Sequence, residues 1–209
     1  MKKFITVVPL QVAGQLRAYR YRAVGNTHLD MEEKTSFPIL TAINGYLRPG
    51  EDARLIALTA PTQDAENNLT ALKTQLADLC ARRGLNAPEV RRVPLEMGDA
   101  VAAHVDAFQK LIDEVEDDDE LFACMTFGSK PLSQAVVMAL QYAYRVKRNA
   151  SIACVVYGGV DRSAGKDPSA WKALVYDETA LVQLDEIVRM LAERGVPDPA
   201  ASIRRILSL

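Results

Sequence analysis

Residues 121–140 read LFACMTFGSKPLSQAVVMAL, and this stretch decides the expected fold. Its first part, Leu121–Phe127, is almost entirely apolar, which predicts a strand covered on both faces of a parallel sheet. Over Leu132–Arg148 apolar residues recur most of the way round a helix, which predicts a deeply packed helix. A buried strand that leads through a short loop into a buried helix is the repeating unit of α/β domains.

The rest of the chain continues this alternation of strands and helices. We expect further strands at Phe4–Leu10, Ala53–Thr59, Glu89–Leu95, Ser151–Tyr157 and Trp171–Tyr176. We expect further helices at Ser36–Leu47 (with Ser36 as N-cap), Asp64–Arg83, Asp99–Val115, Glu178–Arg194 and Ala200–Leu207. The order predicts a Rossmann-like, doubly wound, mostly parallel six-stranded sheet with helices on both faces. Residues 1–176 form this domain, and the helices within 177–209 are expected to pack on it.

One connection is longer than the others. Gln11–Thr35 separates the first strand from the first helix, and its extended stretch before Gly25-Asn26 predicts an inserted β-hairpin at about residues 15–31. Alternation along the strand places Arg17, Tyr19 and Tyr21 on one face, and Arg20 and Arg22 on the other. Aromatic and guanidinium planes stack on nucleobases. The alternative is a solvated hairpin whose tyrosines pack on the core.

Composition limits the class of protein. The chain has 209 residues, 49% of them hydrophobic and 25% charged, as expected for one globular domain. Its net charge of −2 argues against a protein that coats duplex nucleic acid. The longest apolar runs have six residues, whereas a membrane span needs about 20, so we expect no membrane segment.

The cysteines and histidines point to a cytoplasmic protein without a zinc centre. The three cysteines lie at wide spacing in apolar stretches, which is typical of reduced core thiols. There is no CxxC pair and there are only two histidines. Of these, His28 is interpreted as a surface residue and His104 as a residue at the edge of the core. We expect neither a metal site nor a cofactor.

The candidate site is the pair of loops that follow the first and fourth strands. In such a sheet ligands bind beyond the carboxyl ends of the strands, where the strand order reverses. The loop after Phe127 combines Gly128, two serines, Lys130 and a helix N-terminus, which suits a phosphate or another anion. The alternative is an ordinary turn, with Ser129 as N-cap and Pro131 in the first helical turn. Neither a P-loop nor GxGxxG is present.

The segment from Leu121 to Ser133 resembles the ligand loop of CARF domains, the CRISPR-associated Rossmann folds. In that family the strand is followed by Thr-Gly-Gly-Thr-Lys-Pro-Met-Ser or a close variant. The matching residues here are Thr126, Gly128, Ser129, Lys130, Pro131, Leu132 and Ser133. Phe127 stands where many members have glycine. The first strand, the insertion and the helix that follows also resemble one CARF subgroup.

The resemblance implies a homodimer that binds cyclic oligoadenylate, a second messenger of type III CRISPR antiviral defence, across its two-fold axis. A domain of this kind without an appended nuclease is either a ring nuclease that cleaves the messenger or a sensor that regulates a separate effector protein or transcription. If the resemblance is set aside, the alternative function is that of a Rossmann-like enzyme acting on a small anion or nucleotide. The expected ligand-binding residues are Pro9, Leu10, Gln11, Thr126, Phe127, Gly128, Ser129, Lys130, Pro131, Ser133, Arg17 and Tyr19.

For cleavage, the sequence predicts a metal-independent reaction in which a ribose 2′-hydroxyl attacks its own adjacent phosphate. Lys130 and Ser129 would stabilise charge on the phosphoryl oxygens, and Gln11 would orient the hydroxyl. No cluster of His, Asp and Glu is expected at the crevice, so no conventional general base is predicted. The acidic run 113–120 is interpreted as a solvated loop at the opposite end of the sheet. The Gly-rich stretch 158–169 is expected to be a loop. It would form a wall of the pocket, a part of the dimer contact, or a loop with neither role.

Overall fold

The strands form one sheet in the order β2-β7-β6-β5-β1-β3-β4, with seven strands among the described residues. The computed structural model describes residues 1–12, 14–98, 100–163, 165, 167 and 171–208. The strands are β1 (Lys2–Val7), β2 (Tyr21–Val24), β3 (Ala53–Thr59), β4 (Glu89–Pro94), β5 (Glu120–Cys124), β6 (Ser151–Asp161) and β7 (Lys172–Asp177). The helices are η1 (Thr27–Leu29), α1 (Ile39–Tyr46), α2 (Gln63–Arg83), α3 (Val101–Asp113), α4 (Lys130–Val146), α5 (Thr179–Glu193) and α6 (Pro199–Leu207).

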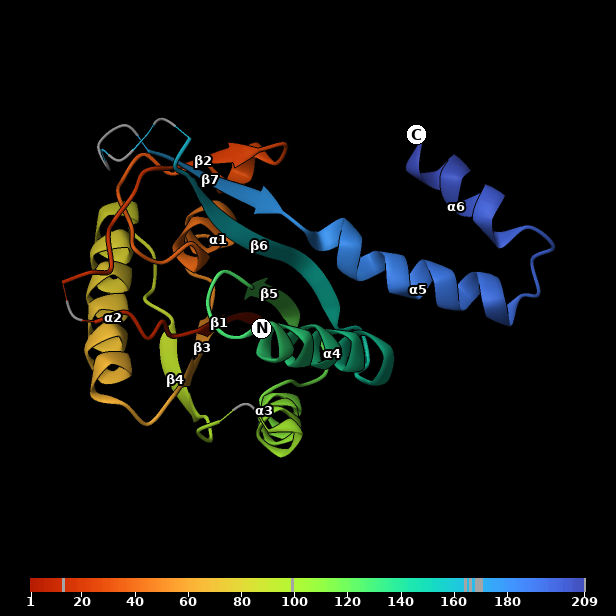
Figure 1. Ribbon diagram of the computed structural model, residues 1–209, viewed down its shortest axis with the longest axis horizontal. Coiled ribbons are helices and arrows are strands. Elements are labelled where there is room, and N and C mark those ends of the chain that lie inside the picture. Colours follow the sequence, from red (N-terminus) through yellow and green to blue (C-terminus); the bar gives the residue numbers. More distant parts are fainter. Residues whose placement is uncertain (13, 99, 164, 166, 168–170, 209) are drawn as a thin grey trace.

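Five adjacent strands, β4, β3, β1, β5 and β6, are parallel to one another. Strand β7 runs antiparallel to β6, and β2 runs parallel to β7. Helices α1 and α2 cover one face, while α3, α4 and the start of α5 cover the other (Figure 1). The predicted Rossmann-like α/β class is therefore confirmed.

The inserted segment differs from the prediction. Instead of a hairpin it adds a single edge strand, β2, so the sheet has seven strands rather than six. The outer edge of β7 would otherwise expose a row of unpaired backbone groups, and β2 satisfies them. Asn26 then accepts a hydrogen bond from the His28 amide and caps η1, which leads the chain away from a second strand. The only hairpin-like contact described is an isolated antiparallel bridge between Tyr19 and Thr35.

Among the element boundaries that differ from the sequence prediction, two have a clear cause in specific contacts. Strand β6 continues through the expected loop to Asp161, and a β-carbon on Gly158 would lie 2.4 Å from Cγ of Pro38, so only glycine allows this close approach. Helix α1 has Pro38 rather than Ser36 at its N-cap position. The Ser36 amide instead donates to Oε1 of Gln75 at 2.9 Å, which ties the start of α1 to α2.

The acidic run lies at the amino end of β1, but one of its members is not solvated. Asp119 is 2% exposed, and its carboxylate lies 2.7 Å from Nζ of Lys3, which is fully buried. Nζ of Lys3 also donates to the Glu114 carbonyl at 2.7 Å, and Glu116 lies at the exposed end of the cluster. The prediction of a solvated loop is thus wrong for Asp119, because its charge is matched by a lysine from the neighbouring strand.

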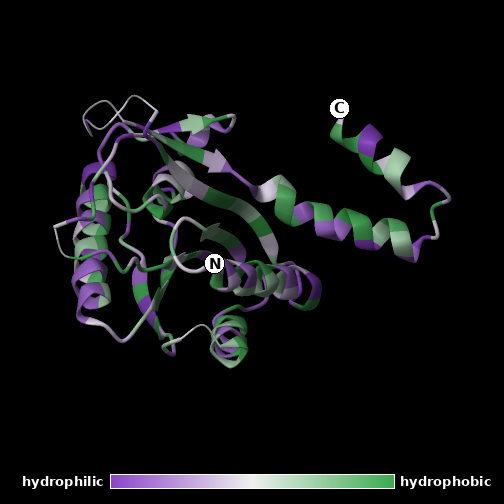
Figure 2. Ribbon diagram, in the orientation of Figure 1, coloured by the Kyte–Doolittle hydropathy of each residue, from purple (hydrophilic) through white to green (hydrophobic). Residues whose placement is uncertain are grey.

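The C-terminal helices contact the domain mainly through the beginning of α5. Val182 is 4% exposed and joins the core, and Arg145 of α4 forms ion pairs with Asp185 and Glu186. Helix α6 has no buried residue among those described, and α6 with the end of α5 extends away from the sheet (Figure 1). These helices carry apolar residues outside the body of the domain (Figure 2). No helix in the described ranges is long and apolar enough to cross a bilayer.

Candidate ligand site at the carboxyl ends of the strands

Strand order reverses at β1, which has β3 on one side and β5 on the other. The loops that follow β1 and β5 meet there over a hollow of about 690 Å³, which we call the crevice cavity. Seven of the predicted ligand-binding residues line it: Pro9, Leu10, Gln11, Thr126, Phe127, Gly128 and Ser129. The structure thus brings the two predicted loops together at one edge of the sheet.

A buried asparagine holds the loop after β1. Asn68 of α2 is 4% exposed, and its Nδ2 donates to the carbonyl oxygens of Pro9 and Gln11, each at 2.8 Å. This positioning residue was missed in the sequence. The available signal is that Asn68 interrupts the apolar stripe of α2 beside Leu69 and Leu72.

The loop after β5 turns sharply at Gly128, where φ is 100°. A β-carbon there would press on Val7 at 3.3 Å and Leu132 at 3.2 Å, so glycine is favoured by both conformation and space. Oγ of Ser129 accepts a hydrogen bond from the Leu132 amide at 3.3 Å and caps α4. The capping interpretation of Ser129 and Pro131 is therefore part of the geometry of this loop.

Three predicted residues of the loop after β5 lie outside the crevice cavity. Lys130 is the first residue of α4, is exposed, and forms no ion pair with a described residue. Pro131 instead lines a neighbouring apolar groove between α3 and α4. The Ser133 amide bonds to the Ser129 carbonyl at 3.0 Å, within the helix. Lys130 thus stands at the rim, one residue beyond the Ser129 wall.

A histidine that the sequence placed at the edge of the core lies in the cavity wall. His104 lines the crevice cavity, and its Nε2 is 3.4 Å from Oγ of Ser129. Glu96, in the loop after β4, lines the same cavity. The sequence analysis expected no cluster of His, Asp and Glu at the crevice, and the described residues form no such group of three or more, but His104 and Glu96 each reach the cavity wall. The fold brings the start of α3 to the same sheet edge as the start of α4, which sequence spacing does not reveal.

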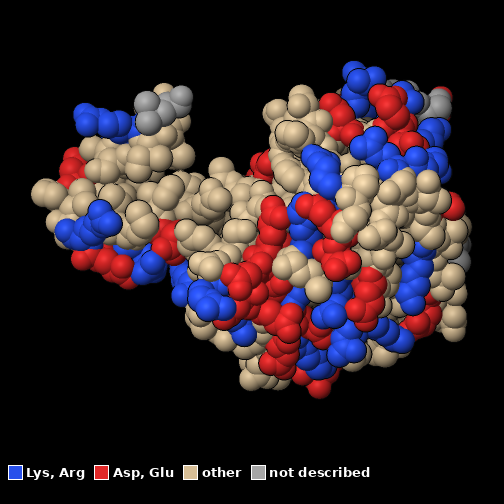
Figure 3. Space-filling view, turned by 180° about the vertical axis from the view of Figure 1, so that it is seen from behind, with Lys and Arg blue, Asp and Glu red and all other residues tan. Residues whose placement is uncertain are grey.

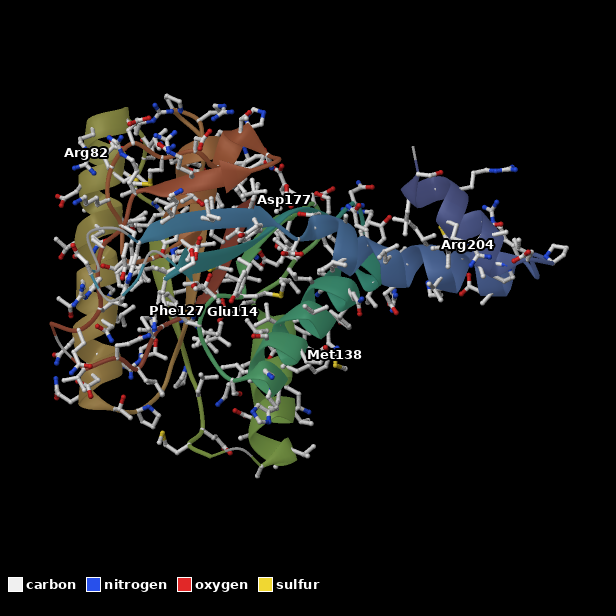
Figure 4. The ribbon with its side chains drawn as sticks, turned by 45° about the horizontal axis from the view of Figure 1, so that its top comes forward. Arg82, Glu114, Phe127, Met138, Asp177 and Arg204 are labelled. Atoms are coloured by element: carbon white, nitrogen blue, oxygen red, sulfur yellow. The ribbon has the colours of Figure 1, made fainter. Side chains whose placement is uncertain are left out.

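Thr126 joins the loop after β5 to β6. Its Oγ1 accepts a hydrogen bond from the Gly158 amide at 2.7 Å and another from Sγ of Cys124 at 3.2 Å. Phe127 follows it and lines both the crevice cavity and a second hollow. Phe127 lies in the body of the domain, far from Arg204 on α6, so the C-terminal helices of the same chain do not reach this site (Figure 4).

The second hollow, of about 480 Å³, we call the edge cavity. It is lined by Gln11, Gly14, Gln15, Leu16, Arg17, Tyr19, Tyr21, Ser36, Thr126, Phe127, Gly158, Val160, Arg162 and Trp171. The predicted face of Arg17, Tyr19 and Tyr21 is thus found in one wall. Arg20 pairs with Glu32 at 2.8 Å and lines a further hollow that also includes Arg17, Tyr19 and Trp171. Burial raises the pKa of Tyr21, so its phenol is neutral at physiological pH.

The cysteines are free and buried, as the sequence predicted. Burial, assisted by the nearby Asp177 carboxylate, raises the pKa of Cys154 to about 12. Burial also raises the pKa of Cys124, which precedes the ligand loop. Because thiolates rather than thiols are nucleophiles, neither group serves as one at neutral pH.

Comparison with known proteins does not extend this description. No family model matches the chain, and no curated protein sequence matches it significantly. The features of the chain that point to a ligand are the residues and geometry of the two adjoining cavities.

Proposed function

We propose that this protein is a cytoplasmic, homodimeric binder of cyclic oligoadenylate that acts in type III CRISPR antiviral defence. The observation that carries the proposal is the meeting of the β1 and β5 loops with the N-terminus of α4 over the crevice cavity. Its 690 Å³ lies within the range of about 300–1,000 Å³ that is usual for small-molecule sites. The resemblance of the loop at Thr126–Ser133 to CARF domains supplies the identity of the ligand.

A dimer accounts for the position of Lys130. Lys130 of one chain stands at one point of the rim and can contact only one part of a ring. An isologous dimer presents the same rim twice around a two-fold axis, so a symmetric ring can contact both lysines and both helix N-termini. We therefore expect the axis of the dimer to pass near Lys130.

Calorimetric titration with cyclic tri-, tetra- and hexa-adenylate tests this function. We expect one ring to bind per two chains, with linear oligoadenylate of the same length as the control for ring recognition. Light scattering of the same samples should show a dimer at micromolar concentration. A chain that remains monomeric with and without every ring, or that binds none of them, would refute the proposal and leave a Rossmann-like enzyme for another small anion or nucleotide.

Lys130→Ala should weaken ring binding by roughly tenfold to a hundredfold, the usual effect of losing a charge-assisted hydrogen bond. Because Lys130 is exposed and forms no described ion pair, thermal melting should be unchanged. Lys147→Ala, at the other end of α4, is the matched control and should bind normally. Equal affinities for the two variants would remove Lys130 from the site.

A further inference from the structure

Positive charge is unevenly divided between the two cavities. On the face opposite to that of Figure 1, acidic and basic side chains are mixed, so that face as a whole does not carry charge of one sign (Figure 3). Among its described lining residues, the crevice cavity has no lysine or arginine and includes Glu96. The edge cavity is lined by Arg17 and Arg162 and by no described carboxylate. Neither arginine forms an ion pair with a described residue, so an anion entering this hollow meets two unpaired guanidinium groups.

The same hollow offers flat aromatic surfaces. The guanidinium carbons of Arg17 and Arg162 lie 5.7 and 4.8 Å from the ring centre of Trp171. Nε1 of Trp171 donates to the Gly165 carbonyl at 2.8 Å, which restrains the indole. Tyr19 and Tyr21 pack edge to face, with ring centres 6.4 Å apart. Nucleobases stack on such rings, while guanidinium groups bind phosphate oxygens.

We propose that the edge cavity is a nucleotide subsite that takes one purine nucleotide unit of the ligand. The base lies against Trp171 and Tyr19, and Arg17 and Arg162 bind the adjoining phosphate. The inference deepens the proposed function and rests on it for the identity of the whole ligand. Its physical basis is the combination, in a hollow of about 480 Å³, of aromatic walls with two unpaired cations.

The two cavities are arranged to share one extended ligand. Gln11, Thr126 and Phe127 line both of them, so no further element separates the two hollows. A ligand with one nucleotide in the edge cavity can place its next phosphate in the crevice cavity, towards the N-terminus of α4. Phe127, the residue that departs from the family pattern, forms part of the boundary between the two units.

The position of the only tryptophan makes the subsite directly measurable. Because Trp171 is the single tryptophan of the chain, intrinsic tryptophan fluorescence reports on the surroundings of this one residue in the cavity wall. Adenosine 5′-monophosphate should change the fluorescence saturably, whereas adenosine and ribose 5-phosphate, which each carry half of the recognised group, should bind more weakly. Arg17→Met and Arg162→Met should each weaken binding of the monophosphate by roughly tenfold or more.

Arg22→Met is the matched control, because it removes the same charge from the same segment at an exposed residue that lines none of the hollows described. It should bind like the wild type, and all three variants should melt normally. If a cyclic oligoadenylate binds without a change in Trp171 fluorescence, and with equal affinity to all three variants, the subsite is refuted while the proposed function stands. If the monophosphate binds as described but no ring binds, the subsite stands and the proposed function fails.

Discussion

Replacing Asp119 with alanine should lower the free energy of unfolding by about 3–5 kcal/mol, the usual cost of breaking a buried ion pair by removing one partner. Lys3 is fully buried, and its ammonium lies 2.7 Å from the Asp119 carboxylate. The Asp119 carboxylate also accepts the Glu116 amide at 2.7 Å. The variant leaves a buried positive charge and a buried donor without this partner. Urea unfolding measures the loss.

Two further variants separate the contribution of the buried ion pair to stability from that of the surrounding acidic loop. Glu116→Ala removes a carboxylate that is 3.0 Å from the same ammonium but 70% exposed, and we expect it to cost no more than about 1 kcal/mol. The double variant Lys3→Met with Asp119→Leu should recover much of the lost stability, because no isolated charge then remains buried. An Asp119→Ala variant as stable as Glu116→Ala would show that the pair contributes little.

His104→Ala should slow metal-independent ring cleavage by about a hundredfold, which is the lower end of the usual contribution of a general base. In the proposed reaction the ribose 2′-oxygen attacks the adjacent phosphorus, and the bond from phosphorus to the 5′-oxygen breaks. We propose that His104 would accept the 2′ proton, while the 5′-oxygen would take a proton from water. The product is a linear oligoadenylate that ends in a 2′,3′-cyclic phosphate. His104 is placed for this role by its position in the crevice wall, 3.4 Å from Ser129.

The measurement is incubation with cyclic tetra-adenylate in excess EDTA, followed by chromatography of the products. The variant should retain ring affinity, since the imidazole is not the main phosphate contact. His28→Ala, at an exposed histidine that lines neither cavity, is the control. Products that appear only after magnesium or manganese is restored would contradict this mechanism. If the wild type binds the ring and forms no products at all, the protein is a sensor that regulates a separate effector.

The architecture of the domain could be predicted from the chain because it is encoded in local patterns. Ala53–Thr59 was predicted with the bounds that β3 has in the structure, since its apolar run begins after a Pro-Gly turn. Capping of α4 by Ser129 was the alternative interpretation of its loop, and the sequence could offer it because N-cap and proline preferences act within one helical turn. Because right-handed crossovers join these elements, the β1 and β5 loops meet at the same edge of the sheet.

Other features depend on residues that are distant in the sequence, so only the tertiary structure decided them. The segment at Tyr21–Val24 has the pattern of a strand, but its partner β7 begins at Lys172, and no local signal specifies that pairing. His104 reaches Ser129 across 25 residues, and Lys3 of β1 pairs with Asp119, which directly precedes the neighbouring strand β5. Hydrophobic periodicity indicates which face of a helix or strand is buried, but it does not identify the residues that pack against that face. The sequence by itself therefore determined the class of sheet and the loops at its reversal, whereas packing decided which polar groups face the two cavities.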